Sequence, residues 1–363
     1  MTTHPATTSA PVRVLIVDDS ALVRQVLSRE LSRDPQIAVV GVACDAYSAR
    51  EKIVALRPDV ITLDIQMPRM DGISFLRRLM QYQPMPVIIV SGLAAEGASA
   101  AIEAMSAGAV DVVSKPAPGE SVERLCAGLA EKIKAVAHAH VGRLPMSPRK
   151  RPAPQTATRS IAEKLLVLGA STGGVKALTE IIASFDSRTP PILVVQHMPP
   201  VFTASFAQRL DLVSAVRVAE ARDGDEVLAG HVLIAPGGFH MLLRRRGTGY
   251  FVQVKDGPKV CHQRPSVDVL FQSVAQAAGV NAVGALLTGM GNDGAEGLLA
   301  MRKAGARTMA QDEHTSVVFG MPAEAIRNGA AEQVVPSDQI ASAMLSMAGS
   351  QQTGARILQR EQL

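Results

Sequence analysis

The sequence predicts two α/β domains, each built on a mostly parallel sheet. Short apolar runs recur along the chain, and each ends at a polar or ionisable residue before a helical pattern begins. Aliphatic residues dominate the 47% hydrophobic content, since aromatic residues make up only 3% and tryptophan is absent, as is usual in parallel sheets. A length of 363 residues also suits about two domains.

The first domain alternates apolar runs with helical patterns, which predicts five parallel strands and five helices in a doubly wound sheet. Ligands of such sheets bind beyond the carboxyl ends of the strands. The clearest strands are expected at 12–17, 60–63, 87–90 and 109–113, and helices around 47–57, 72–82, 97–107 and 119–139.

The strand ends of this domain carry Asp18 and Asp19, Asp64, Ser91 and Lys115. Three carboxylates that converge repel one another unless a cation lies among them, and hard oxygen ligands favour Mg²⁺. A lysine and a hydroxyl suit the oxygens of a phosphoryl group. The pattern therefore predicts phosphoryl transfer to one carboxylate, although any single aspartate at a strand end could instead cap a helix or be solvated.

The segment 138–160 contains four prolines and few large apolar residues, and it reads as an exposed interdomain linker. Five basic residues and no acid lie within 141–160; removing them from the net charge of +4 leaves −1 for the rest of the chain. The folded parts are therefore near neutral, and we expect no nucleic-acid partner. The cluster Arg149-Lys150-Arg151 could bind a nucleic acid or an acidic partner, but a solvated tether is the favoured interpretation.

The second domain begins with the apolar run of LLVLGASTGG, residues 165–174. Gly169-x-Ser171-x-Gly173 fits a nucleophile elbow, in which a strand, a sharp turn and a helix expose a serine hydroxyl. A glycine-rich phosphate loop or a plain tight turn remains an alternative. Further strands are expected at 191–196, 231–235, 282–287 and 307–310, with a hairpin that pairs 241–246 with 250–255 and helices over about 175–185 and 265–278.

His197 follows the predicted strand 191–196, and Asp293 lies in the loop after 282–287. Together with Ser171 they could supply a nucleophile, a base and an orienting carboxylate at one sheet edge. His240 is a rival base by position, and Asp293 could merely cap the helix that begins near Ala295. The order Ser, His, Asp differs from that of the α/β-hydrolases.

The motifs VLIVDDS, LDIQMPRMDG, VSG and SKP resemble the receiver domain of bacterial response regulators, which has a flavodoxin-like fold. The resemblance implies Asp64 as the phospho-acceptor. It implies Asp19 as a Mg²⁺ ligand, Asp18 as an assisting ligand through water, and the backbone carbonyl of Gln66 as a further ligand.

The same resemblance implies that Ser91 and Lys115 contact the phosphoryl group. Receivers usually carry tyrosine or phenylalanine three residues before the lysine, and this chain has Val112 there. A signal that depends on rotation of that aromatic ring is therefore not expected. Movement of the loop near Ser91 is the expected alternative.

The motifs GASTGG, QHMPP, APGGFHM and LLTGMGNDGA resemble the catalytic domain of the chemotaxis protein-glutamate methylesterases, the CheB family. The resemblance implies the triad Ser171, His197 and Asp293 and hydrolysis of γ-glutamyl methyl esters on chemoreceptors, with release of methanol and often deamidation of receptor glutamines. The N–H groups near Thr172 and Met290 are candidates for the oxyanion site. No metal is expected at this second site.

We therefore expect a receiver at 11–137, a linker at 138–160, a catalytic domain at 161–348 and a disordered tail at 349–363. The substrates would be methyl-accepting chemoreceptors and the phosphodonor a chemotaxis histidine kinase, in the cytoplasm and without membrane insertion. Scattered cysteines and an N-terminus without a signal-peptide core fit that location. The alternative is a response regulator with a catalytically inactive binding domain as its output.

Overall fold

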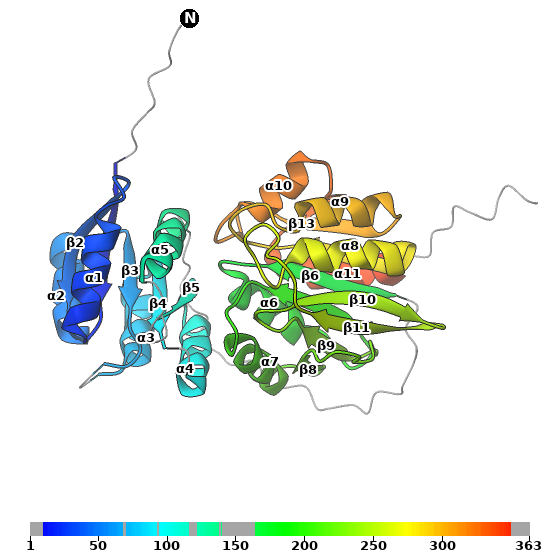
Figure 1. The fold of residues 1–363 in the computed structure, drawn as a ribbon, viewed down its shortest axis with the longest axis horizontal. Helices are drawn as coiled ribbons and strands as arrows, with labels where there is room; N and C mark the ends of the chain where they lie inside the picture. Colours follow the sequence, from blue (N-terminus) through cyan, green and yellow to red (C-terminus); the bar gives the residue numbers. More distant parts are fainter. Residues whose placement is uncertain are drawn as a thin grey trace, which may run out of the picture.

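The computed structural model describes residues 10–67, 70–92, 94–115, 122–137, 139 and 164–349. Two separate parallel sheets lie side by side, each with its own helices (Figure 1). Apart from residue 139, the predicted linker lies outside the described residues, as does the predicted tail after 349. No described helix is long and apolar enough to cross a membrane.

The first sheet has the five parallel strands that the sequence predicts, and their order is β2-β1-β3-β4-β5. Alternate strand residues face two apolar layers, one under α1 and α5 and the other under α2, α3 and α4. The elements are β1 (Val12–Val17), α1 (Ala21–Leu31), β2 (Ile37–Ala43), α2 (Ala46–Leu56), β3 (Val60–Leu63), α3 (Gly72–Tyr82), β4 (Val87–Ser91), α4 (Ala95–Ser106), β5 (Asp111–Ser114) and α5 (Val122–Val136).

The second sheet has seven parallel strands in the order β14-β13-β12-β6-β7-β9-β8. One face packs against α6, α7 and α11, and the other against α8, α9 and α10. The strands are β6 (Leu165–Ala170), β7 (Ile192–Gln196), β8 (Arg217–Glu220), β9 (His231–Ile234), β12 (Ala282–Leu286), β13 (Arg307–Gln311) and β14 (Gln333–Val335). The helices are α6 (Gly174–Ala183), α7 (Phe202–Val213), α8 (Val267–Ala277), α9 (Ala295–Lys303), α10 (Met321–Arg327) and α11 (Ile340–Gly349).

Two features beside the predicted strands complete this domain. The predicted hairpin is confirmed as the antiparallel pair β10 (His240–Arg246) and β11 (Gly249–Lys255). The sequence analysis did not predict β8 and β14, the two edge strands of the sheet. β8 has only four residues and β14 only three, and both strands are partly exposed. They therefore lack the apolar run that marks a buried strand.

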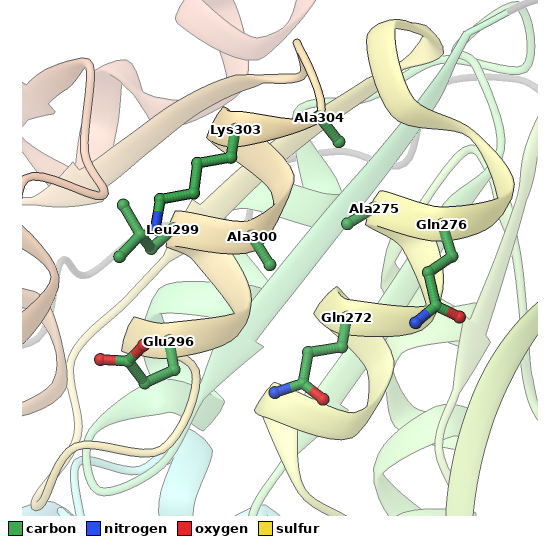
Figure 2. Close-up of a pocket in the computed structure, with 8 residues that line it drawn as sticks. All are labelled: Gln272, Ala275, Gln276, Glu296, Leu299, Ala300, Lys303 and Ala304. Atoms are coloured by element: carbon green, nitrogen blue, oxygen red, sulfur yellow. The ribbon is translucent and has the colours of Figure 1, made fainter.

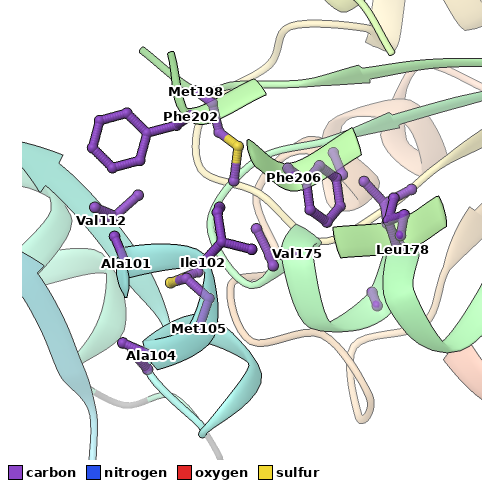
Figure 3. Packing of buried hydrophobic residues seen from close by; sticks show 14 of the residues in the cluster. Ala101, Ile102, Ala104, Met105, Val112, Val175, Leu178, Met198, Phe202 and Phe206 are labelled. Carbon is purple, nitrogen blue, oxygen red and sulfur yellow. The ribbon is translucent and has the colours of Figure 1, made fainter. Parts of the chain in front are cut away.

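The two domains share a continuous apolar cluster in which α4 of the first packs against α6 and α7 of the second (Figure 3). Ile102 and Met105 of α4 lie opposite Val175 of α6 and Phe206 of α7 in this cluster. All four side chains are almost fully buried. In this arrangement, therefore, the first domain is closed against the second. The first domain covers the end of the second sheet at which β6 leads into α6.

Candidate functional site

Ser171 follows the last residue of β6 and precedes α6, in the strand-turn-helix context that a nucleophile elbow requires. Gly173 has a φ of 81°, and a Cβ there would lie 2.5 Å from the Cβ of Val317. At Gly174 a Cβ would lie 2.1 Å from Oε1 of Gln196. The turn therefore needs both glycines, one for its backbone conformation and both for space.

Ser171 and His197 lie at the same level of two neighbouring strands. Ala170 of β6 pairs with Gln196 of β7 in the parallel register, so the next residue of each strand leaves the sheet beside the other. The amide Nε2 of Gln196 donates to the carbonyl of Ser171 at 2.8 Å and to that of His197 at 3.3 Å. Gln196, which the sequence analysis did not single out, thus ties the two turns together.

Asp293 contacts His197, with 2.7 Å between Oδ2 and Nε2. Their side chains are 2% and 5% exposed. Burial raises the pKa of Asp293, but the hydrogen bond and the charge of His197 and further donors outweigh it, so that the pKa lies below its ordinary value. In the neutral form of the imidazole, the ionised Asp293 accepts the proton of Nε2, which leaves Nδ1 of His197 as the acceptor nitrogen.

Nδ1 of His197 is buried and has no hydrogen-bond partner among the described residues. The hydroxyl of Ser171 likewise makes no hydrogen bond to the described residues, although its backbone N–H donates to the carbonyl of Thr288 at 3.0 Å. The structure therefore brings His197 and Asp293 into contact and places Ser171 beside them without a direct bond. Hydrogen bonds of this kind often tighten only when substrate binds.

His240, the rival base, has both ring nitrogens engaged elsewhere. Nε2 lies 2.9 Å from the carbonyl of Pro258, and Nδ1 lies 3.3 Å from the N–H of Ser266. This pattern defines an imidazole that donates through Nε2 and accepts through Nδ1. His240 therefore has no nitrogen left for a substrate or for Ser171.

The two candidate oxyanion donors, the N–H groups of Thr172 and Met290, have no hydrogen-bond acceptor in the described part of the chain. The loop with Met290 lies against the serine turn, because a Cβ on Gly289 would be 2.7 Å from Cβ of Ser171. The N–H of Gly173, in contrast, donates to the carbonyl of Val110 in the first domain at 3.0 Å.

In the first domain, candidate ligand oxygens of Asp18, Asp19 and Asp64 lie within 4.8 Å of one another. Nζ of Lys115 contacts Asp64 at 2.7 Å and Asp18 at 2.8 Å. Burial raises the pKa of Asp64 although Lys115 opposes that shift. An all-oxygen donor set with two buried carboxylates fits a hard divalent cation such as Mg²⁺.

Gln66 and Ser91, the two uncharged residues predicted for this site, are held by hydrogen bonds. The backbone N–H of Gln66 donates to Oδ1 of Asp64 at 3.2 Å, whereas a role for its carbonyl as a ligand stays a prediction. The hydroxyl of Ser91 donates to the carbonyl of Gly97 in α4 at 3.3 Å. Ser91 thus bonds through its hydroxyl to the helix that packs on the second domain, and its carbonyl accepts the N–H of Lys115 at 2.7 Å.

A cavity of about 410 Å³ lies between α8 and α9 (Figure 2). It is lined by Gln272, Ala275, Gln276, Glu296, Leu299, Ala300, Lys303 and Ala304. None of the predicted site residues lines it.

A receiver-like sheet with an acidic cluster, joined to an α/β domain with serine, histidine and aspartate at one sheet edge, defines a response regulator whose output domain is a hydrolase. The CheB methylesterase family model matches residues 166–344, and the response regulator receiver domain model matches residues 14–126. The chain belongs to the CheB methylesterase family.

Relatives match over almost their full length. The chain is 52% identical over 360 residues to protein-glutamate methylesterase/protein-glutamine glutaminase 5 of Anaeromyxobacter dehalogenans, covering 94% of this chain and 98% of that protein. It is 46% identical to protein-glutamate methylesterase/protein-glutamine glutaminase 2 of Pseudomonas aeruginosa, covering 96% and 100%. The crystal structure of the Thermotoga maritima CheB methylesterase catalytic domain matches with a TM-score of 0.50 and 40% identity, covering 51% of this chain and 98% of that one.

Proposed function

We propose that this protein is a phosphorylation-regulated hydrolase that removes methyl groups from glutamate γ-methyl esters of chemoreceptors in the cytoplasm. The observation that carries this proposal is the buried pair of His197 and Asp293 beside Ser171, at the carboxyl edge of the sheet. Relatives about half identical to the chain are named for this methylesterase activity and for a second one, protein-glutamine glutaminase.

The geometry suggests a role for each residue. Oγ of Ser171 attacks the ester carbonyl while Nδ1 of His197 accepts its proton, because Nε2 is engaged by Asp293. The N–H groups of Thr172 and Met290 stabilise the oxyanion. Nδ1 then returns the proton to the departing methanol. A water molecule, deprotonated at the same nitrogen, cleaves the acyl-serine to regenerate Ser171 and the free glutamate.

Deamidation of receptor glutamines follows the same course. The amide carbonyl takes the place of the ester carbonyl, and Nδ1 of His197 delivers its proton to the departing ammonia. Both reactions give an acyl-serine at Ser171 and then a glutamate side chain, so one site serves two substrates.

The receiver would accept a phosphoryl group from a chemotaxis histidine kinase on Asp64. Asp18, Asp19, Asp64 and the carbonyl of Gln66 would hold Mg²⁺, which when bound offsets the negative charge of the transferred group. Lys115 contacts Asp64, so its ammonium group would bind the oxygens of the transferred phosphoryl group, and Ser91 would supply a hydroxyl to them.

The receiver would inhibit the second domain by covering it. Its β5 region contacts Thr172 and Gly173, directly beside Ser171, and α4 packs on α7 (Figure 3). A phosphoryl group on Asp64 that attracts the hydroxyl of Ser91 would break its bond to Gly97 at the start of α4. Opening a modest interdomain interface needs only a few kcal/mol of differential stabilisation.

Methanol release from methylated chemoreceptor membranes tests the proposed activity. Ser171→Ala should abolish release while leaving phosphorylation at Asp64 intact, because the two sites lie in separate domains. The alternative, an inactive output domain that only binds a partner, predicts no methanol release from the wild-type protein either.

A further inference from the structure

We propose that Ser266 is a positioning residue of the esterase reaction, whose hydroxyl, together with the first turn of α8, holds Asp293 in line with Nε2 of His197. This inference rests on the proposed function, since it assigns Asp293 the role of orienting His197. It adds a residue that the sequence motifs did not indicate.

The carboxylate of Asp293 is satisfied on both oxygens by α8. Oδ1 accepts hydrogen bonds from Oγ of Ser266 at 2.8 Å and from the N–H of Asp268 at 3.1 Å. Oδ2 accepts from the N–H of Val267 at 2.7 Å and faces His197. Three of the four donors thus come from consecutive residues at the start of one helix.

The start of a helix is a suitable place for a buried carboxylate. The first N–H groups of a helix lack partners within the helix, and its dipole favours negative charge there. Asp293 is 2% exposed, and a buried carboxylate without such donors would be costly to ionise. The donors are therefore what allows Asp293 to stay charged next to His197.

The backbone of Ser266 is hydrogen-bonded to His240. The Nδ1 atom of His240 accepts the N–H of Ser266, and its Nε2 contacts the carbonyl of Pro258. Ser266 is fully buried and has little freedom to turn away from Asp293. Its orientation is thus set by contacts on both sides, and it fixes the carboxylate in turn.

Ser266 also caps α8, because its Oγ accepts the N–H of Val269 at 3.4 Å. Loss of the hydroxyl would therefore remove both a cap and a donor to Asp293. Three substitutions separate the two roles. Ser266→Ala removes both, Ser266→Asp keeps a good cap but places a second negative charge against Asp293, and Ser266→Thr keeps the hydroxyl.

The test measures methanol release and NMR of the full-length chain in parallel. We expect Ser266→Ala and Ser266→Asp to lower kcat by about 10-fold to 100-fold, the factor that a hydrogen bond to a charged group contributes, with KM within twofold. The carboxyl ¹³C resonance of Asp293 should titrate at higher pH in both variants, and the downfield proton of His197 Nε2 should weaken. Ser266→Thr should restore all three properties.

The matched control is Asp45→Ala, which removes the N-cap of α2 in the first domain. It should lower thermal stability without changing kcat or the Asp293 titration. The proposal is overturned if Ser266→Ala and Ser266→Asp retain wild-type kcat, or if the titration of Asp293 does not move. If Ser266→Ala does not fold, the comparison of kcat and of the Asp293 titration between Ser266→Asp and Ser266→Thr tests the proposal. Activity that survives Ser171→Ala would refute the proposed function, whereas the Asp293 titration would still test Ser266.

Discussion

Oγ of Thr172 lies 2.5 Å from Oδ2 of Asp111, a hydrogen bond that joins the two domains one residue from Ser171. Asp111 is 5% exposed and also pairs with Lys132 of α5 at 2.7 Å. The carbonyl of the preceding residue, Val110, accepts the N–H of Gly173. The edge strand of the receiver is therefore bonded to the serine turn itself.

Asp111→Ala should raise the methylesterase activity of the unphosphorylated chain by about tenfold, because it removes a charge-assisted hydrogen bond that exists only while the domains are closed. Methanol release without phosphodonor measures the effect. Asp34→Ala is the control, since Asp34 pairs with Lys134 of α5 within the first domain. Equal activity of the two variants would show that this bond does not keep the domains closed.

Ile102→Ala should also raise the activity of the unphosphorylated chain. Ile102 of α4 is 2% exposed and packs toward the second domain (Figure 3), so truncation should destabilise the closed arrangement. The control is Ile53→Ala in α2, where the side chain is equally buried within the receiver itself. That variant should lower the melting temperature and leave basal methanol release unchanged. Activation by both would instead indicate general unfolding of the receiver.

An acyl-phosphate donor with Mg²⁺ should activate the full chain but not Asp64→Ala, which lacks the acceptor carboxylate. Residues 161–363 alone should exceed the unphosphorylated full chain in activity and should not respond to the donor. The catalytic domain of the Thermotoga maritima relative crystallised by itself, which supports the use of this fragment. If fragment and full chain are equally active, the receiver does not act by covering the site.

The stability of the protein should fall as the pH rises from about 4 to about 6, through Asp268. Burial raises the pKa of Asp268 to about 6, despite the N–H of Gly297 that it accepts. A folded pKa above the unfolded value favours the protonated form, so this contribution is full at low pH and is lost as the carboxyl ionises. The difference of about two pKa units corresponds to about 3 kcal/mol.

Asp268→Asn should remove this part of the pH dependence, because the amide oxygen can still accept the N–H of Gly297. Denaturant unfolding of the full chain at pH 4, 5, 6 and 7 measures it. We expect the variant to lose less stability than the wild type over this interval. Parallel curves for the two proteins would assign the pH dependence to other groups.

The sequence by itself determined the two α/β domains and the candidate residues of both sites. Buried parallel strands are continuous apolar runs, and in such sheets the polar residue that follows a strand lies at the ligand-binding edge. That is why Asp64 and Ser171 could be proposed as site residues from the chain alone. The short edge strands β8 and β14 were not predicted, because partly exposed segments of three or four residues lack a continuous apolar run.

The tertiary structure decided which groups touch. Ser266 reads in the sequence only as a serine before a helix, and its bond to Asp293 depends on α8 beginning beside the loop after β12. The choice of His197 over His240 depends on the strand register and on the carbonyl of Pro258. The bond between Thr172 and Asp111 depends on how the two domains pack. Contacts between residues far apart in the chain follow from packing of whole elements, and local patterns do not encode them.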